Sequence, residues 1–321
     1  MAEPAASAAA VSPQSLTSIV VATDFSPCSA VAVAQAIRIG SWARATVHVV
    51  HVIDTVVVIE LEHALSSMQQ NIRNSLIDDA TLAWKSFATT IPGASDLPVE
   101  VVINNRIVGI LGCAREHNAD LLIVGAFGHS PPDLGMGTVA SACVRKSASN
   151  VLLVRDTQPG AFNSIVAAVD FSDTSALALV RAADFAAGEN ATLHAVHIFE
   201  APWQQVNYGR PQTAETHRLQ ADYRDQLVAR LHEFVKPAAA AYPNLRLQVS
   251  CHDSFGHRSG IVEFARSVTA DLIVLGTRGR TNLRDILLGS TAEEALHESH
   301  CSVLAVKPHG FSHALGSGAA V

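Results

Sequence analysis

Short hydrophobic runs alternate with helix-length segments along the whole chain. In the second half we expect strands at residues 165–169, 192–198, 245–250, 272–275 and 303–306. Helices are expected between them: one at 176–187, apolar around most of its circumference, and a longer, more charged one at 214–236. Strands alternating with helices in this way are typical of βαβ units with a buried parallel sheet. The pattern therefore predicts a three-layered α/β fold.

The same order of segments occurs twice. The sequence Ser-Ile-Val-Val-Ala-Thr-Asp-Phe-Ser at residues 18–26 is matched by Ser-Ile-Val-Ala-Ala-Val-Asp-Phe-Ser at 164–172. Segments 45–52 and 118–125 likewise match segments later in the chain, and both halves end in similar apolar runs. Such self-similarity indicates a tandem duplication.

The repeat sets the expected domain boundaries. We expect one domain at residues 16–156 and a second at 164–308, joined by a linker at 157–163 that contains Pro-Gly. The ends, residues 1–15 and 309–321, are expected to be a disordered and a flexible tail.

A glycine-rich pattern follows the apolar run at residues 271–275. Gly276, Gly279, Gly289 and Ser290 form the spacing G-x2-G-x9-G-S. The carboxyl ends of parallel strands are where α/β sheets bind phosphates, and glycines let the backbone approach an anion closely. The sequence Ser-Thr-Ala-Glu that starts at Ser290 predicts a capping box, so a helix should begin there and present free N–H groups.

These motifs resemble those of the universal stress protein family, in its tandem form. The resemblance rests on a first strand ending in Asp-Phe-Ser, a second ending in His-Val-Ile-Asp, and the G-x2-G-x9-G-S loop, and it covers residues 18–155 and 164–307. It implies two Rossmann-like domains of the adenine nucleotide α-hydrolase type, each a five-stranded parallel sheet flanked by helices. It also implies that the last strands, 151–154 and 303–306, pair inside the chain, giving an intrachain pseudo-dimer and leaving a homodimer open.

The resemblance further implies that the second half binds ATP, or ADP or AMP, with Mg²⁺. The aspartate after the first strand and the residue after the second-strand histidine would lie against the adenosine, and the loop would hold the phosphates through its N–H groups. The expected contacts are Asp170, Ile198, Gly276, Arg278, Gly279, Arg280, Gly289, Ser290 and Thr291. Three alternatives stay open: the two arginines form a solvated loop face, the glycines serve turns only, and the aspartate forms an Asx-turn or helix cap.

The first half predicts a degenerate site. Its corresponding residues are Asp24, Val52, Gly125, Gly128, Gly137 and Thr138. The second gap of the loop is eight residues instead of nine and contains Pro131-Pro132, which removes backbone donors. Ala-Phe replaces Thr-Arg after the first glycine, which deletes a positive charge.

Composition excludes several classes of protein. A net charge of −7 without a cluster of Lys and Arg argues against nucleic-acid binding. No segment approaches the roughly 20 apolar residues of a membrane span, and the first residues do not resemble a secretory signal. The five cysteines show no C-x-x-C pair. We therefore expect a cytoplasmic protein with no membrane partner.

No metal site and no catalytic residue are predicted. Of the fifteen histidines, His48 and His51 are three residues apart in a strand and so fall on opposite faces. The segment Cys-His-Asp at 251–253, with His257, has no recognised zinc spacing. Neither a G-x-x-x-x-G-K-[ST] loop nor a G-x-S-x-G elbow is present, so efficient hydrolysis is not expected.

The leading hypothesis is an ATP-binding regulatory protein of the stress response, whose association with an unidentified protein partner changes with nucleotide occupancy. A slow ATPase that uses the same pocket and a nucleotide-free scaffold are the two alternatives.

Overall fold

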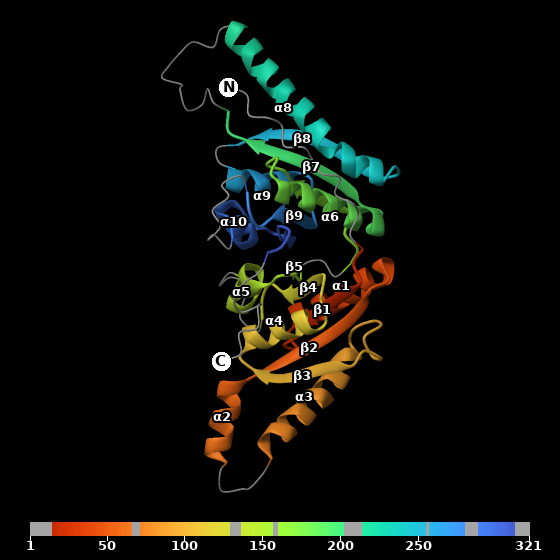
Figure 1. The fold of residues 1–321 in the computed structure, drawn as a ribbon, viewed down its shortest axis with the longest axis vertical. Helices are drawn as coiled ribbons and strands as arrows, with labels where there is room; N and C mark the ends of the chain where they lie inside the picture. Colours follow the sequence, from red (N-terminus) through yellow and green to blue (C-terminus); the bar gives the residue numbers. More distant parts are fainter. Residues whose placement is uncertain are drawn as a thin grey trace. The chain divides into compact units, whose positions relative to one another are not determined.

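The computed structural model describes residues 15–65, 71–128, 136–156, 160–201, 214–254, 257–279 and 288–311 (Figure 1). The chain divides into two compact units. The C-terminal unit is Phe162–His300, and the N-terminal unit is Ser15–Ala161 together with the segment that begins at Cys301. Of the tails expected at 1–15 and 309–321, residues 1–14 and 312–321 lie outside the described residues, as do residues 157–159 of the expected linker.

The N-terminal unit alternates strands and helices along the chain. Its elements are β1 (Ser18–Ala22), α1 (Pro27–Ala43), β2 (Thr46–Asp54), α2 (Thr55–Ala64), α3 (Ile72–Ala88), β3 (Val99–Asn104), α4 (Arg106–Glu116), β4 (Leu121–Gly125), α5 (Thr138–Lys146), β5 (Asn150–Val154) and β10 (Ser302–Val306). The strands lie in the order β3-β2-β1-β4-β5-β10. The first five are parallel, and β10 runs antiparallel to β5. The chain order reverses between β1 and β4, which creates the switch point at which ligands bind in such sheets.

The C-terminal unit repeats this arrangement. Its elements are β6 (Ser164–Ala168), α6 (Asp173–Glu189), β7 (Thr192–Phe199), α8 (Ala214–Ala241), β8 (Arg246–Asp253), α9 (His257–Ser267), β9 (Leu272–Gly276) and α10 (Ser290–Glu298). The strands lie in the order β9-β6-β7-β8 and are all parallel. The switch point therefore falls between β6 and β9.

The hydrophobic runs form the core of each unit because both faces of the central strands are covered by helices. Ile19 in β1 and Leu122 in β4 are fully buried, as are Ile165 in β6 and Leu193 in β7. Helix α1 packs on β1 and β4, and α6 packs on β6 and β9. The predicted α/β fold, with a mostly parallel sheet flanked by helices, is confirmed.

Two details refine the sequence prediction. The helix expected at 214–236 continues to Ala241, with Pro237 inside it. Proline removes one helical hydrogen bond, but here it does not end the helix. The expected pairing of the last strands of the two halves is confirmed, because Leu304 of β10 lies opposite Leu152 of β5 in an antiparallel register. The two compact units thus differ from the two sequence repeats by the strand β10.

Candidate functional site

The turn that follows β6 is held by a short network of hydrogen bonds. Oδ1 of Asp170 accepts from the backbone N–H of Ser172 at 3.0 Å and from the Ser172 hydroxyl at 2.5 Å. Phe171, between them, has a left-handed backbone with φ of 63°. Ser172 is the N-cap of α6, and its Oγ accepts from the N–H of Ser175 at 3.1 Å. Asp170 therefore forms an Asx-turn through Oδ1, a role that leaves its second oxygen, Oδ2, outside the turn.

The glycine-rich loop after β9 approaches this second oxygen closely. A Cβ atom at Gly279 would lie 2.8 Å from Oδ2 of Asp170, so only glycine allows this approach without displacing the carboxylate. A Cβ atom at Gly276 would lie 2.8 Å from Cγ2 of Thr174, in the first turn of α6. The carboxyl ends of β6 and β9, with the start of α6, thus meet at the switch point of the unit.

The far end of the loop leads into α10. The N–H of Gly289 donates to the carbonyl of Thr277 at 2.9 Å, which ties the end of the loop to its beginning. Gly289 is the N-cap of α10 and no side chain caps this helix, so the predicted capping box that starts at Ser290 is wrong. Gly289 has the extended backbone that an N-cap needs, with φ of −68° and ψ of 146°, and Ser290 is already the first helical residue. The N–H groups of Ser290 and Thr291 therefore begin a helix whose positive dipole end has no side-chain cap.

The other predicted nucleotide contacts of the C-terminal unit are Ile198, Arg278 and Arg280. Ile198, near the end of β7, is 5% exposed, and a Cβ atom at Gly260 of α9 would lie 2.6 Å from its Cγ2. Its side chain therefore packs on α9. Arg278 is half-buried on the loop, and Arg280 lies outside the described residues. The structure brings Gly279 to Asp170 and ties Gly289 to the beginning of the loop, whereas the side chain of Ile198 is buried against a helix.

The turn after β1 in the N-terminal unit repeats the first of these networks. Oδ1 of Asp24 accepts from the N–H of Ser26 at 3.1 Å, and Phe25 has φ of 61°. Ser26 caps α1 by accepting from the N–H of Ser29 at 3.2 Å. A Cβ atom at Gly128 would lie 2.9 Å from Oδ2 of Asp24. The aspartate and the second loop glycine therefore face each other in both units.

The ends of the N-terminal loop also match. A Cβ atom at Gly125 would lie 3.1 Å from Sγ of Cys28 in α1, and the N–H of Gly137 donates to the carbonyl of Ala126 at 2.9 Å. Gly137 is the N-cap of α5 without a side-chain cap, and Thr138 is the first helical residue. The gap between Gly128 and Gly137 is one residue shorter than in the C-terminal unit, but the contacts at both ends of the loop are the same. Pro131-Pro132 lie outside the described residues.

The two loops differ in the residue that lies two positions after their first glycine. In the N-terminal unit this is Phe127, which is 8% exposed and clusters with Cys28 and Ala126. The guanidinium carbon of Arg155 lies 4.9 Å from the centroid of the Phe127 ring. In the C-terminal unit the same position is Arg278. A buried phenylalanine, Phe127, thus stands in the N-terminal unit where the C-terminal unit has the positively charged Arg278.

Val52, the N-terminal counterpart of Ile198, also packs on a helix: a Cβ atom at Gly109 of α4 would lie 2.9 Å from its Cγ1. The second strand residue is therefore a packing residue in both units.

A pair of aromatic rings under each turn was not predicted. The ring of Phe25 stacks on His51 with centroids 4.4 Å apart, and the centroids of Phe171 and His197 are 4.5 Å apart. Nδ1 of each histidine lies within 2.9 Å of the carbonyl of the residue that precedes the turn aspartate. A carbonyl only accepts, so Nδ1 carries the proton in each case. Burial lowers the pKa of His51. Asp-Phe-Ser and the strand histidine are repeated in both halves of the sequence, but this repetition does not show that the phenylalanine and histidine rings are in contact.

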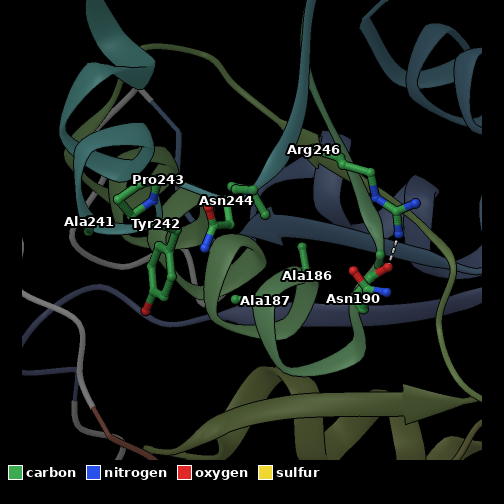
Figure 2. A pocket seen from close by; sticks show the side chains of 10 residues that line it. Ala186, Ala187, Asn190, Ala241, Tyr242, Pro243, Asn244 and Arg246 are labelled. Atoms are coloured by element: carbon green, nitrogen blue, oxygen red, sulfur yellow. Dashed lines mark hydrogen bonds between the residues drawn. The ribbon is translucent and has the colours of Figure 1, made fainter.

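A pocket in the C-terminal unit lies away from this loop (Figure 2). It is formed by the last turn of α6, the end of α8 and the start of β8. Figure 2 shows Arg246, the first residue of β8, donating a hydrogen bond to the carbonyl of Asn190 beside it. Because the glycine loop follows the carboxyl end of β9 and this pocket lies at the amino end of β8, the two features are at opposite edges of parallel strands.

The model of the universal stress protein family matches residues 16–155 and again residues 161–307. The chain belongs to the universal stress protein family. It is a tandem member, because the family model matches twice. The family resemblance derived from the strand ends and the glycine loop is therefore confirmed.

Relatives agree with this assignment. The universal stress protein Rv2623 of Mycobacterium tuberculosis is 26% identical over 299 residues, which cover 90% of this chain and 96% of that protein. Universal stress protein A homolog 1 of Coxiella burnetii is 33% identical over 150 residues, covering 45% of this chain and 96% of its own length. The crystal structure of a putative universal stress protein of Pseudomonas aeruginosa matches with a TM-score of 0.60 and 19% identity, covering 91% of this chain and 94% of that one. This last likeness supports the fold.

Within the described residues of this universal stress protein, no helix is both long and apolar enough to cross a membrane.

Proposed function

We propose that this universal stress protein binds an adenine nucleotide, with ATP and Mg²⁺ as the expected form, in the loop between β9 and α10. The observation that carries the proposal is the approach of Gly279 to Oδ2 of Asp170, beside the start of a helix that no side chain caps. We further propose that nucleotide occupancy regulates its association with a protein partner in the stress response. Binding to one arrangement of the loop is sufficient for such regulation, and no chemical step is required.

Each end of the nucleotide has a matching group. The phosphates would accept hydrogen bonds from the loop N–H groups and from those of Ser290 and Thr291 in the first turn of α10, where the helix dipole favours negative charge. Arg278 would add a positive charge to this part of the loop. Oδ2 of Asp170 is an acceptor for ribose hydroxyls, while Oδ1 keeps the turn in place through Ser172. Ile198 would contact the nucleoside through main-chain atoms, since its side chain packs on α9.

The N-terminal unit would bind the same ligand more weakly. Its Asp24 and Gly128 have the same mutual position, and α5 also begins at a glycine without a side-chain cap. However, buried Phe127 stands where the other loop has Arg278. We therefore expect one strong site and one weak site in each chain.

Calorimetric titration of the full chain with MgATP tests the proposal through a matched pair of variants. Gly289→Val adds a side chain at the N-cap of α10, where the backbone suits any residue and the new Cβ would lie 3.6 Å from the carbonyl of Thr277. Gly137→Val makes the same change at α5, where the Cβ would lie 3.5 Å from the carbonyl of Ala126. Both contacts are ordinary packing distances, so both variants should fold.

We expect Gly289→Val to lose the strong site and Gly137→Val to keep it. Loss in Gly137→Val alone would place binding in the N-terminal unit and contradict the proposal. No binding by a folded wild-type chain would favour the nucleotide-free scaffold. Analysis of the same samples for ADP separates slow hydrolysis from binding alone.

A further inference from the structure

A cluster of metal-ligating side chains lies in the N-terminal unit, away from the glycine loop. Glu100 is the second residue of β3, and Cys113 and Glu116 lie in the last turns of α4. One ligand atom from each of these three residues lies within 4.8 Å of the other two. Because α4 follows β3 and runs back along the sheet, its last turn lies near the amino end of β3. The cluster is therefore at the opposite edge of the sheet from the loop that follows β4.

Glu100 is the centre of the cluster. Its Oε1 lies 3.4 Å from Sγ of Cys113, and its Oε2 lies 2.8 Å from Nε2 of His117, the C-cap of α4. Cys113, Glu116 and His117 are at positions i, i+3 and i+4, so they share one side of the helix. Cys113 is 2% exposed, whereas the side chains of His117 and Glu100 are 29% and 39% exposed. The cluster thus has a buried thiol at its base and is open to solvent above it.

The imidazole of His117 is held in place from behind. The ring of His48, in β2, stacks on it with centroids 3.9 Å apart and an interplanar angle of 18°. This stack limits the rotation of the His117 ring and keeps its Nε2 on the side of Glu100. His48 therefore orients the cluster and is not needed as a ligand.

In the structure, hydrogen bonds to Glu100 link the groups that a metal ion would otherwise bind. The thiol donates to one oxygen of Glu100. The imidazole of His117 donates to the other oxygen of Glu100. A divalent ion among these atoms would replace the protons and neutralise the carboxylate, as metal binding does at sites that are built from thiols and imidazoles.

The C-terminal unit shows that the fold does not require these groups. Gly260 of α9 packs on β7 as Gly109 of α4 packs on β2. Counting along each helix from these glycines, Phe264 corresponds to Cys113 and Val268 to His117. In the strand register, Ser250 of β8 corresponds to Glu100 of β3. There, His194 lies edge-on to the ring of Phe264, with centroids 6.3 Å apart at 73°. An aromatic contact fills the position in one unit, and a set of ligands fills it in the other.

We propose that Glu100, Cys113 and Glu116 bind one divalent transition-metal ion, with Zn²⁺ as the best fit, and that His117, which contacts this group through Glu100, supplies the fourth ligand. A thiolate, an imidazole and carboxylates are the groups that zinc takes in a four-coordinate site, whereas Ca²⁺ and Mg²⁺ prefer oxygen ligands alone. His117 would exchange its hydrogen bond with Glu100 for the metal. The ion would then join β3 to the end of α4 and stabilise the N-terminal unit by mass action.

Cobalt spectroscopy of the full, chelator-treated chain is the direct test, because a cysteine thiolate bound to Co²⁺ gives a charge-transfer band that carboxylates and imidazoles do not. We expect this band in the wild type and its loss in Cys113→Ser. The matched control is Cys251→Ser, which removes a half-exposed cysteine from β8, next to a histidine. The control should keep the band. A band that survives in Cys113→Ser, or that disappears in Cys251→Ser, would overturn the proposal.

A second variant is needed because Cys113→Ser alters a buried residue and could disturb folding. Glu116 is exposed, so Glu116→Gln should fold as the wild type does. It should weaken Zn²⁺ about tenfold or more in competition with a chromophoric chelator. Zn²⁺ should raise the Tm of the wild type and leave that of Cys113→Ser unchanged, and its affinity should rise with pH because binding releases the thiol proton. Equal Zn²⁺ affinity in the wild type, Glu116→Gln and Cys113→Ser would refute the site.

Discussion

The turn after β1 and the turn after β6 are built by the same contacts, yet the loops that face them have different chemistry. In both units an aspartate accepts from a serine two residues later, and that serine caps the next helix. In both, the second oxygen of the aspartate faces a glycine. Beside that glycine, however, Phe127 is buried in one unit and Arg278 lies on the loop in the other. The contacts that hold the backbone are thus present in both copies, while the side chain two residues after the first loop glycine differs.

The same division holds at the amino edge of the strands. The glycines that let α4 and α9 pack on the second strand are present in both units. The neighbouring positions contain Cys113 in one unit and Phe264 in the other. Comparing equivalent positions therefore separates the residues that the fold needs from those that give each unit its own chemistry.

The largest expected effect concerns the two turn aspartates. Asp170→Asn keeps an oxygen for the Ser172 N–H but removes the charge that faces Gly279. If the C-terminal unit holds the strong site, this change should lower nucleotide affinity by about 10- to 100-fold, the value of a hydrogen bond to a charged group. Asp24→Asn should leave the strong site unchanged. Calorimetric titration checks both, and equal losses would mean that the two units bind alike.

The second prediction concerns the first glycine of each loop. Gly276→Ala places a methyl group 2.8 Å from Cγ2 and 3.2 Å from the backbone of Thr174, both in packed surroundings. We expect it to lower the free energy of unfolding by about 1–3 kcal/mol. Gly125→Ala meets Sγ of Cys28 at 3.1 Å and should cost less. Urea denaturation measures the two values, and a larger loss at Gly125 would contradict this order.

The third prediction concerns the two helix caps. Ser26→Ala removes the acceptor for the N–H of Ser29 and should cost about 1 kcal/mol of stability. Ser172→Ala removes the corresponding cap and also the hydroxyl that donates to Asp170, so it should cost more than Ser26→Ala. Thermal unfolding at matched concentrations would show the order, and identical shifts would mean that the hydroxyl bond to Asp170 contributes nothing.

The smallest effect concerns pH. Burial lowers the pKa of both His48 and His194, and the neighbouring His117 lowers that of His48 further. The unfolded chain binds these protons first, at its ordinary pKa of about 6.5, so the free energy of unfolding should fall as pH decreases through that value. His117→Gln should raise the pKa of His48 and leave that of His194 unchanged. NMR titration of the ring protons tests this, and a downward shift at His48 would contradict it.

Patterns within the sequence were enough for the fold and for part of the site. Apolar runs gave the strands, because both faces of a parallel strand are buried, and the spacing of Gly276, Gly279 and Gly289 located a loop that the structure closes on Asp170. The cap of α10 was misassigned for a physical reason. Serine is the better N-cap residue, but a hydrogen bond from Gly289 to the carbonyl of Thr277, twelve positions earlier, fixes the start of the helix.

Contacts that depend on strand register lay beyond the sequence. Phe25 and His51 meet because β1 and β2 are in a particular parallel register, which no local pattern determines. The cluster around Glu100 depends on the length of α4 as well, since that length decides which side chains return to the beginning of β3. The expectation of no metal site weighed histidine pairs within one strand and the segment 251–253 with His257, and these candidates did not include the residues around Glu100.

The position of β10 has a consequence for how the chain can be divided. The last strand of the second repeat pairs with β5 and belongs to the compact unit of the first repeat. A fragment cut at the join between the repeats would therefore carry a bare hydrophobic edge at β5, and such an edge recruits other strands. Removal of the last twenty residues would damage the half of the protein that is farther away in sequence. A single sequence repeat therefore cannot be separated without breaking the pairing of β5 with β10. A fragment intended for isolated study should include both of these strands.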